Sequence, residues 1–456
     1  MRLDPQRGER IDRSRPVAFS FAGWKITGFE GDTLGSAAFA AGKRVFSRSF
    51  KYHRPRGLLC CSGHCPNCLM TVDGVPNVRV CTEPIREGAV VEGQNVRWSL
   101  DFDFMSVTDK IGGPFTPVGF YYRTFIRPRR LWPLYEKFLR SAAGLGKLDE
   151  QAGHSRRYDT EHRKARVLVV GGGSAGRAAA LAAATTGPGV VLVDEDASLS
   201  ALQLDGVEVL APARALGIWE GGLVPVDAGT VLYRFRAERI VVATGATEQP
   251  VVFPGNDLVG VMLPNGVRRL VRDFSIKPGN RAVVLAADDE GLEIVDDLDK
   301  AQVAVSRAID LRETKPFELV AQGSKGRVRR LVVDGETIDC DLLVASGGRQ
   351  PAYSLLAQAG ARIEFDSDLG VFVPTELPPG VEAVGSVTGE GCSSNALPAY
   401  AGKGRCFVCV CEDVTTKDMK RAIAEGFDSI ELAKRYTTTT MGPCQGKLCH
   451  LPSIRL

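Results

Sequence analysis

Arg166-Val-Leu-Val-Val-Gly171-Gly172-Gly173-Ser174-Ala175-Gly176 joins an apolar run to an alanine-rich segment through a turn of glycines. A parallel strand that enters a helix through such a turn is typical of dinucleotide-binding units, in which the helix N-terminus holds a pyrophosphate. The first glycine permits the tight turn, the second lets the backbone approach phosphate, and the third lets the helix pack on the strand. We therefore predict a cofactor-binding turn made by Gly171, Gly173, Ser174, Ala175 and Gly176.

Further segments downstream favour the same interpretation. A second apolar run, 190–193, ends in two acids at about the spacing of an acid that binds a ribose hydroxyl. A strand that begins at Arg239 ends in a turn of small residues, and another small residue follows a later strand near the far end of the cofactor. A glycine-rich turn that binds nothing would not need these features together. The additional predicted cofactor-binding residues are Asp194, Glu195, Ala243, Thr244, Gly245 and Gly385.

A second possible nucleotide unit, residues 281–291, has the apolar strand but lacks the glycine turn. Three acids, Asp288, Asp289 and Glu290, stand where phosphates would lie. Like charge and absent glycines both oppose phosphate binding. We predict that this unit binds no dinucleotide.

The first cysteine-rich segment follows a predicted strand, turn, strand and helix, the last of these running from Thr33 to Ala41 with Asp32 as its cap. This order opens a β-grasp domain, and the cysteine spacing C-x4-C-x2-C-x12-C is that of plant-type 2Fe-2S ferredoxins. A structural zinc site is the alternative, although zinc ribbons pair two C-x2-C knuckles and only one is present. The predicted ligands are Cys60, Cys65, Cys68 and Cys81, with Cys61 left over.

The last fifty or so residues carry a second set of cysteines around two predicted helices. Capping-box patterns at Thr415–Asp418 and Asp428–Glu431 mark where these helices begin. Four thiolates spaced C-x-C and C-x4-C fit a second 2Fe-2S cluster better than zinc, because C-x-C pairs are unusual in zinc ribbons. The predicted ligands are Cys409, Cys411, Cys444 and Cys449; Cys406 is a spare thiol and His450 a solvated neighbour.

Composition sets broad limits. The 456 residues have a net charge of +3, with 57 basic and 54 acidic side chains, so a nucleic-acid partner is not expected. No run reaches the ~18 apolar residues of a spanning helix, and the charged N-terminus has no apolar core behind it. Most of the 12 cysteines fall in the two sets, which favours metal over disulfides. We expect a cytoplasmic protein with no membrane span.

The predicted fold class is α/β, and the chain is predicted to divide into five parts. They are a β-grasp ferredoxin-like 2Fe-2S domain (1–100), a connector (101–163), a Rossmann-like FAD/NAD body (164–270 and 340–400), the degenerate second nucleotide domain (271–339) and a small helical BFD-like 2Fe-2S domain (401–456).

The order of these parts resembles the alpha subunit of the heterotetrameric sarcosine oxidase family. It is similar to the iron–sulfur branch that contains subunits of hydrogen cyanide synthase, opine oxidase and D-hydroxyproline dehydrogenase. The matching stretches are Ser49–Gly57, Val72–Arg79, Val118–Tyr122, Phe253–Met262, Lys434–Thr438 and Met441–Lys447. In the sarcosine oxidase subunit proper the cysteines are largely lost. The presence of both sets here therefore implies clusters and an electron acceptor other than oxygen.

The resemblance implies cofactors and partners. A separate flavoprotein beta subunit would oxidise the amine, and this chain would carry electrons toward a downstream acceptor. FAD is the expected occupant of the glycine-rich turn, with NAD as the alternative, and an FMN at a subunit interface is compatible with the family although no residue here can be named for it. Long relatives continue into a folate domain, so the chain is either a short member or a fragment.

We therefore predict an oxidoreductase acting on CH-NH groups. In this prediction the chain is the electron-transfer subunit of a heteromeric amine or imino-acid dehydrogenase or oxidase of the sarcosine, proline, hydroxyproline or opine type. No catalytic residue is assigned to the chain itself. One alternative is a stand-alone NAD(P)H-dependent pyridine-nucleotide or ferredoxin reductase, and another is a zinc-stabilised binding scaffold.

Overall fold

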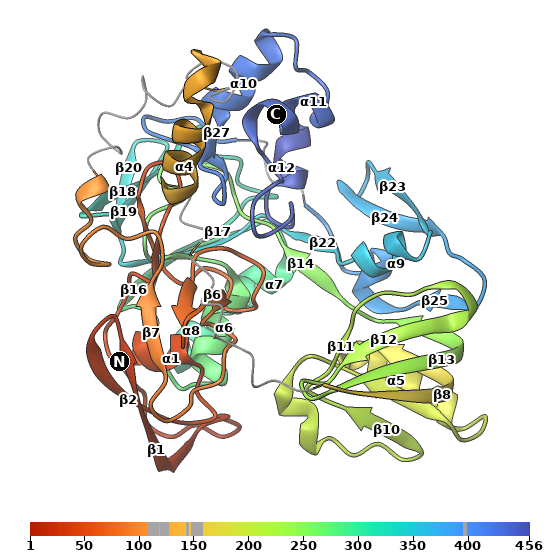
Figure 1. The fold of residues 1–456 in the computed structure, drawn as a ribbon. Helices are drawn as coiled ribbons and strands as arrows, with labels where there is room; N and C mark the ends of the chain where they lie inside the picture. The colour runs from red at the N-terminus through yellow and green to blue at the C-terminus, as the bar shows by residue number, and fades with distance from the viewer. Residues whose placement is uncertain (107–117, 119–126, 143–145, 147–157, 395–398) are drawn as a thin grey trace. The chain divides into compact units, whose positions relative to one another are not determined.

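The computed structural model describes the whole chain except residues 107–117, 119–126, 143–145, 147–157 and 395–398. The fold is mixed α/β, as predicted, and the chain divides into two compact units (Figure 1). Unit 1 comprises Met1–Ala152, Glu248–Gly347 and Ala396–Leu456, and unit 2 comprises Gly153–Thr247 and Gly348–Asn395. Among the described residues, no helix has both the length and the apolar character needed to cross a membrane.

The N-terminal part of unit 1 is a five-stranded sheet with one helix. Ala22 and Gly23 both have positive φ, as the two-residue hairpin between the first two strands requires. The first and last strands of this region pair in parallel, and the other pairs are antiparallel. The elements are β1 (Asp12–Phe21), β2 (Trp24–Glu30), β5 (Leu69–Val72), β6 (Val75–Arg79) and β7 (Val90–Gly93), in the order β2-β1-β7-β5-β6, and α1 (Leu34–Ala40).

The N-cap of helix α1 is Thr33, so the prediction of Asp32 as its cap is wrong. The Thr33 side chain accepts a hydrogen bond from the Ser36 N–H, and the Ser36 hydroxyl accepts one from the Thr33 N–H. The Asp32 carboxylate accepts instead from the Phe29 N–H and from the Arg2 guanidinium. The Asp32 side chain therefore forms hydrogen bonds with Arg2 and Phe29 in place of the helix cap that the local pattern predicted.

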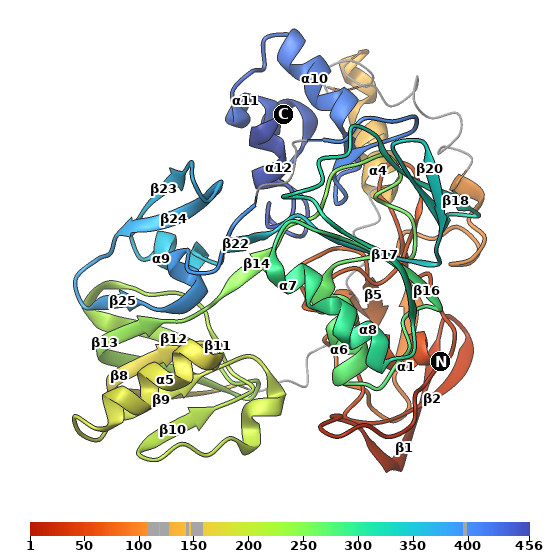
Figure 2. The same ribbon diagram turned by 180° about the vertical axis from the view of Figure 1, so that it is seen from behind.

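A parallel four-stranded sheet forms the middle of unit 1. Its two central strands, β16 and β21, are buried along nearly their whole length, as is usual for parallel strands. The strands are β15 (Val261–Met262), β21 (Leu342–Ser346), β16 (Arg281–Ala286) and β17 (Ala304–Asp310), in that order. Helices α6 (Pro264–Arg272), α7 (Asp289–Leu292) and α8 (Ile294–Lys300) lie side by side (Figure 2). An antiparallel sheet of β18 (Leu319–Ser324), β19 (Arg327–Val333) and β20 (Glu336–Asp339) follows β17 in the chain.

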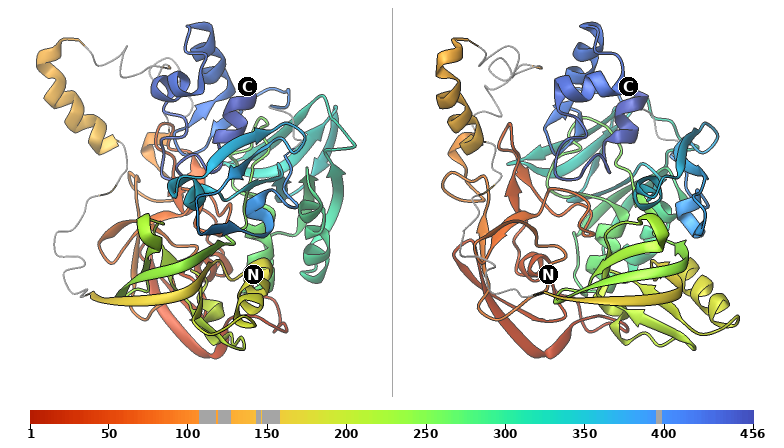
Figure 3. Two further views of the ribbon diagram at one scale, coloured as in Figure 1. Left: turned by 90° about the vertical axis from the view of Figure 1, so that its right-hand side faces the viewer. Right: turned by 45° about the vertical axis from the view of Figure 1, so that its right-hand side comes forward.

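The C-terminal part of unit 1 is a short hairpin followed by three helices, drawn in dark blue in Figure 3. The capping box predicted at Thr415 and Asp418 is present at the start of α10. The next helix begins at Ser429, whose side chain accepts from the Leu432 N–H, and not at the predicted Asp428. The elements are β26 (Phe407–Cys409), β27 (Val414–Thr415), α10 (Thr416–Ala424), α11 (Ile430–Thr437) and α12 (His450–Arg455); the short ribbon β3 (Ser47–Arg48) and β4 (Pro55–Arg56) and helix α4 (Trp132–Ala142) lie elsewhere in unit 1.

Unit 2 is a largely parallel sheet with α5 (Ser174–Ala184) packed against β8 and β9. Its two long strands, β8 and β13, pair in parallel from Asp159 and Val231 to Val170 and Val242. The strands are β10 (Val207–Leu210), β9 (Val190–Val193), β8 (Asp159–Val170), β13 (Val231–Val242), β12 (Leu223–Asp227) and β11 (Arg214–Ala215), in that order, with β25 (Val381–Ala383) also paired to β13. The shorter elements are β14 (Ala246–Glu248), β22 (Arg349–Pro351), β23 (Arg362–Asp366), β24 (Val371–Glu376) and α9 (Ser354–Gln358).

One hydrophobic core joins the first two parts of unit 1. Phe21 and Met70 of the N-terminal sheet belong to the same buried cluster as Met262 and Val284 of the parallel sheet. The two compact units therefore group the chain differently from the five predicted segments, because segments far apart in sequence share a core. The predicted boundaries themselves stay predictions.

Candidate cluster sites and dinucleotide turn

The first predicted cysteine set comes together in unit 1. Three of its members lie on the loop between β4 and β5, and Cys81 follows β6. The sulfur atoms of Cys60 and Cys65 are 3.3 Å apart. Cys60 also contacts Cys81, which in turn contacts Cys68. All four side chains are buried, so water is excluded from the group.

The second predicted set forms a closed ring of contacts. Cys409 contacts Cys411 and Cys449, and Cys444 contacts the same two side chains. Hydrogen bonds from the Cys411 and Cys449 thiols, with further backbone N–H donors, lower the pKa of Cys444 to about 3. The four side chains are buried and come from β26, the turn after it and the segment before α12.

Backbone N–H groups point at sulfur in both sets. The Ser62 N–H lies 3.5 Å from the Cys60 sulfur, and the Asn67 N–H donates to Cys65. In the second set the Glu412 N–H donates to Cys409. Such donors stabilise negative charge on sulfur and tune the potential of iron–sulfur centres.

The two spare thiols stay outside these sets. Cys61 packs in the core beneath the N-terminal sheet, and burial raises the pKa of its thiol. Burial also raises the pKa of Cys406, to about 12.

Within the described ranges, no group of three or more His, Cys, Asp or Glu side chains has the arrangement needed to bind a single metal ion. In a 2Fe-2S cluster each iron takes only two protein ligands, so the thiolates approach in pairs.

The structure brings the two sets into one hydrophobic cluster, which spacing alone did not predict. This cluster contains Cys60 and Cys65 of the first set together with all four cysteines of the second. The apolar side chains between them include Leu59, Val252, Leu263, Val408 and Leu448. The Leu263 N–H donates to the Leu59 carbonyl at 3.0 Å, which fixes one wall of the cluster.

Residues of the basic segment 51–56 form hydrogen bonds and ion pairs that hold the first cysteine set beside the second. The Arg54 guanidinium forms buried ion pairs with Asp413 and with Asp257. The Lys51 and Tyr52 N–H groups also donate to the Asp413 carboxylate, at 2.8 and 3.2 Å. Burial by itself would raise the pKa of Asp413, but Arg54 and Arg56 together lower it. Asp413 is therefore a charged, fully buried anchor for the loop that precedes Cys60.

Four further hydrogen bonds connect other parts of unit 1 to the second set. Arg56 donates to the carbonyl oxygens of Val410 and, at 2.9 Å, of Cys411. Arg79 donates to the Pro443 carbonyl at 2.8 Å, and the Gln249 side-chain amide donates to the Lys447 carbonyl at 3.0 Å. Each acceptor is close in sequence to a cysteine of the second set. The sequence signals only the contacts of Arg54 and Arg56, through the high density of basic residues in segment 51–56.

The glycine-rich turn in unit 2 follows β8 directly. Gly171 has φ +112°, and a Cβ added to Gly176 would lie 1.9 Å from the Gly171 carbonyl oxygen. A Cβ added to Gly173 would meet no atom within 4 Å. Gly173 is also the N-cap of α5 and provides no side-chain cap for the helix. The turn is therefore tightly packed behind and open in front, where the first-turn N–H groups of the helix lie.

Of the other predicted cofactor-binding residues, Ala243 and Gly385 pack against the turn, whereas Thr244 and Gly245 follow Ala243 in the chain. Ala243 packs behind the turn, since its N–H donates to the Val170 carbonyl at 2.7 Å and its carbonyl lies against Gly171. Gly385, at φ +71°, has its backbone against the Ala175 side chain. The Thr244 hydroxyl donates to the Ala352 carbonyl at 3.0 Å, and Gly245, at φ +69°, has open space where a Cβ would be.

The two predicted ribose-binding acids have different surroundings. The Asp194 carboxylate accepts from the Gly172 N–H at 2.6 Å and from the Asp196 N–H at 2.7 Å, so it braces the turn. Glu195 is exposed and pairs with Arg214 at 2.9 Å. The structure thus brings Asp194 to the turn and leaves Glu195 at the surface.

In the corresponding turn after β16, the side chain of Asp288 fills the position at the helix N-terminus. The Asp288 carboxylate caps α7 by accepting from the Gly291 N–H at 3.0 Å, and it also accepts from the Ser346 hydroxyl at 2.8 Å. A phosphate at this position would meet a buried carboxylate that already holds the donors.

Two family models match the ends of the chain. Residues 14–96 match a 2Fe-2S iron–sulfur cluster binding domain, and residues 403–456 match the sarcosine oxidase A3 domain. The first model contains Cys60, Cys65, Cys68 and Cys81, and the second contains Cys409, Cys411, Cys444 and Cys449.

Similar proteins cover nearly the whole chain. The alpha subunit of sarcosine oxidase from Rhizobium meliloti strain 1021 is 31% identical, over 99% of this chain and 56% of that protein. The alpha subunit from Corynebacterium sp. strain P-1 is 26% identical, over 98% of this chain and 53% of that protein. The chain thus spans about half the length of these curated relatives. Among solved structures, L-proline dehydrogenase from P. horikoshii has a similar fold, with a TM-score of 0.73, 19% identity and coverage of 100% of this chain and 93% of that one.

Proposed function

The chain belongs to the family of the sarcosine oxidase alpha subunits, to which it is homologous along nearly its whole length, and from this premise we propose that it relays electrons. In this proposal it is one subunit of a heteromeric flavin-dependent dehydrogenase or oxidase that acts on CH-NH groups of an amine or imino acid. Sarcosine, proline, hydroxyproline and opines are the substrate types to test.

One observation carries the proposal: two sets of four buried cysteines meet in a hydrophobic cluster that contains two members of the first set and all four of the second. Each set has the thiolates that one 2Fe-2S centre needs, and its spacing and backbone N–H donors fit such a centre. A 2Fe-2S cluster, when bound, supplies one-electron transfer. Side chains such as Leu59 and Leu263 would keep water out of the space between the sets. Arg54 and Asp413 would hold the separation of the sets fixed, because the pair is buried on both sides.

The turn after β8 is the proposed dinucleotide site. The open front of Gly173 and the uncapped N-terminus of α5 support phosphate binding there. FAD is our choice of occupant and NAD is the alternative. Gly171, Ser174, Ala175, Gly176, Ala243, Thr244, Gly245 and Gly385 would shape this site, and Asp194 would brace it.

A flavoprotein beta subunit that oxidises the amine is the proposed electron donor, and a separate acceptor would take the electrons away. An FMN between the subunits is compatible with this scheme. The chain's five histidines all lie outside residues 164–400, so the sequence places no histidine base beside the dinucleotide turn. The absence of such a base supports a relay role for this chain.

A stand-alone NAD(P)H reductase is the weaker candidate. Such an enzyme needs a second nucleotide turn, and Asp288 with its hydrogen bonds occupies the corresponding position. No separate observation favours it.

Metal analysis with matched cysteine variants tests the proposal. The whole chain, purified anaerobically, should contain about four iron and four acid-labile sulfide per chain. Cys444→Ser and Cys68→Ser should each lose about half of the iron, because each removes one thiolate of a different set. The control variants Cys406→Ser and Cys61→Ser remove spare buried thiols and should keep it. A colourless protein with zinc in place of iron would refute both cluster assignments.

The relay role needs a separate assay. The reconstituted chain alone should not oxidise the four substrate types with an artificial acceptor, and activity should appear on adding a beta-type flavoprotein. Turnover by the isolated chain at about 1 per second or faster would contradict a relay.

A further inference from the structure

Unit 1 contains a cavity of about 330 Å³ that neither the cysteine sets nor the dinucleotide turn uses. Its walls come from the N-terminal region, through Phe39, Arg44 and Leu58, and from segments at the amino ends of β15, β16 and β21. Nucleotides in open α/β sheets bind at the carboxyl ends of the strands. The cavity is therefore separate from the degenerate second nucleotide position.

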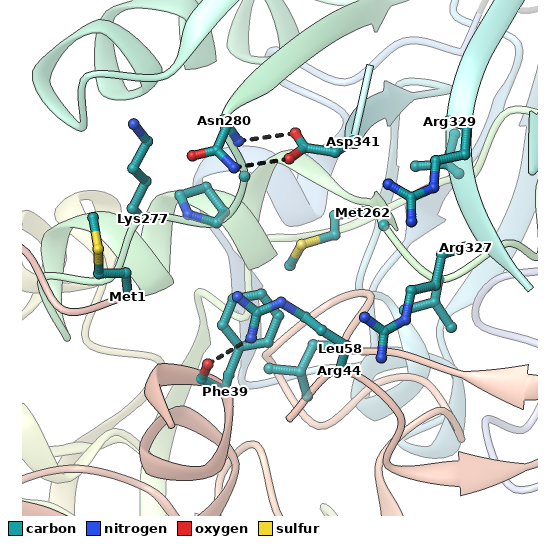
Figure 4. Close-up of a pocket in the computed structure, with 15 residues that line it drawn as sticks. Met1, Phe39, Arg44, Leu58, Met262, Lys277, Asn280, Arg327, Arg329 and Asp341 are labelled. Carbon is teal, nitrogen blue, oxygen red and sulfur yellow. Dashed lines mark hydrogen bonds between the residues drawn. The ribbon is translucent and has the colours of Figure 1, made fainter. Parts of the chain in front are cut away.

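Positive charge dominates the lining. Arg44, Lys277, Arg327 and Arg329 face a single carboxylate, Asp341. Figure 4 shows Arg327 and Arg329 reaching from β19 toward the space beside Arg44. Within the described part of the chain, the side chains of Arg327, Arg329 and Lys277 have no hydrogen-bonding or ion-pair partner.

The one acid in the cavity is already engaged. One Asp341 oxygen accepts from the N–H groups of Asn280 and Arg281, at 2.8 and 2.9 Å. The other accepts from the Asn280 side-chain amide at 3.1 Å, as drawn in Figure 4. Three donors from the segment before β16 therefore hold the carboxylate, and none of them is an arginine of the cavity.

Arg44 is half-buried and has no acidic hydrogen-bond partner among the described residues. Its Nη1 donates only to neutral carbonyls, those of Phe39 at 2.6 Å and Lys43 at 3.2 Å. Its guanidinium also lies 3.8 Å from the centre of the Phe39 ring. Burial, and then repulsion by Arg327, lower the pKa of Arg44 to about 10, and attraction by Asp341 offsets only part of this. A half-buried cation facing other cations is unfavourable unless an anion joins them.

We propose that this cavity binds a small anion with at least two negative charges on oxyanion groups. Guanidinium groups bind phosphate and carboxylate through two parallel hydrogen bonds, so both chemistries fit the three arginines. Phe39, Leu58 and Met262 provide apolar walls for the body of such a ligand. The volume suits a small metabolite.

The test uses isothermal titration of the whole chain, purified with its metal content, with pyrophosphate and with citrate as probes. At least one should bind with one-to-one stoichiometry, and acetate, which has one charge, should bind far more weakly. Affinity should fall as salt is added, because the attraction is electrostatic. Preference for pyrophosphate or for citrate identifies the natural ligand as a phosphate or a carboxylate.

Paired variants locate the site. Arg327→Gln should weaken binding about tenfold or more, and Arg44→Gln should have a similar effect. Arg330→Gln is the matched control: it removes the same charge from the same strand, but Arg330 bonds to Gln322 and does not line the cavity. If Arg44→Gln misfolds, Arg327→Gln alone decides, since its side chain is part-exposed and its removal breaks no described contact. Failure of both probes to bind, or equal weakening by Arg330→Gln and Arg327→Gln, would overturn the proposal.

Discussion

The turns after β8 and after β16 both join a parallel strand to a helix, but only the second has a side chain that caps its helix. Each follows a buried parallel strand and leads into a helix. After β8, glycines leave the N-terminus of α5 open and uncapped. After β16, the Asp288 carboxylate fills that position and takes a helix N–H and the Ser346 hydroxyl. The comparison teaches that, of these two βα units, only the one after β8 leaves its helix N-terminus free for a phosphate.

Gly176→Val should have the largest effect of the changes that probe this comparison. Any Cβ at Gly176 would lie 1.9 Å from the Gly171 carbonyl oxygen, so helix and strand must separate. We expect a loss of about 3 kcal/mol or more in the free energy of unfolding. Chemical denaturation of the whole chain measures this loss, and hydrogen exchange in β8 and α5 shows whether it arises in unit 2. Native stability in this variant would show that the turn is not packed as described.

Gly173→Val should separate binding from folding. Its side chain would meet no protein atom at the Cβ position, so stability should change by less than about 1 kcal/mol. Dinucleotide content should nevertheless fall at least tenfold, because the side chain occupies the approach to the helix N-terminus. Cofactor release followed by chromatography gives the content. Full occupancy in a folded Gly173→Val protein would place the cofactor elsewhere.

Asp288→Ala should have the smallest effect on cofactor binding, since only stability should change. It removes a helix cap and the acceptor of the Ser346 hydroxyl, so we expect a loss of about 1 kcal/mol, up to 2. Asp288→Asn, which can still cap the helix, should lose less than half of that. Neither variant should gain a dinucleotide, because the glycines are still absent. Equal stability of all three proteins in urea would show that the cap contributes nothing.

Sequence patterns predicted the parts of the fold that local chemistry determines. The α/β class is confirmed, and so are the turn between the first two predicted strands and the Thr415–Asp418 capping box. The caps predicted at Asp32 and Asp428 are wrong by one residue each. At Asp32 the reason is visible, because Arg2 and the Phe29 N–H compete for the carboxylate.

The candidate sites divide in the same way. Spacing was enough to group the cysteines into two sets, and their roles as ligands stay predictions. Spacing could not show that the two sets meet in one hydrophobic cluster, because the contacts that join them, such as Arg54 with Asp413, connect residues far apart in the chain. The cationic cavity was missed for the same reason: Arg44 and Arg327 meet only after folding.

The buried pair of Arg54 and Asp413 also sets an order of events during synthesis. The segment that precedes Cys60 cannot find its anchor until residue 413 has left the ribosome, which adds roughly 20 seconds or more at ordinary elongation rates. Until then the contact between the two cysteine sets, whose eight side chains are all buried in the finished chain, cannot form.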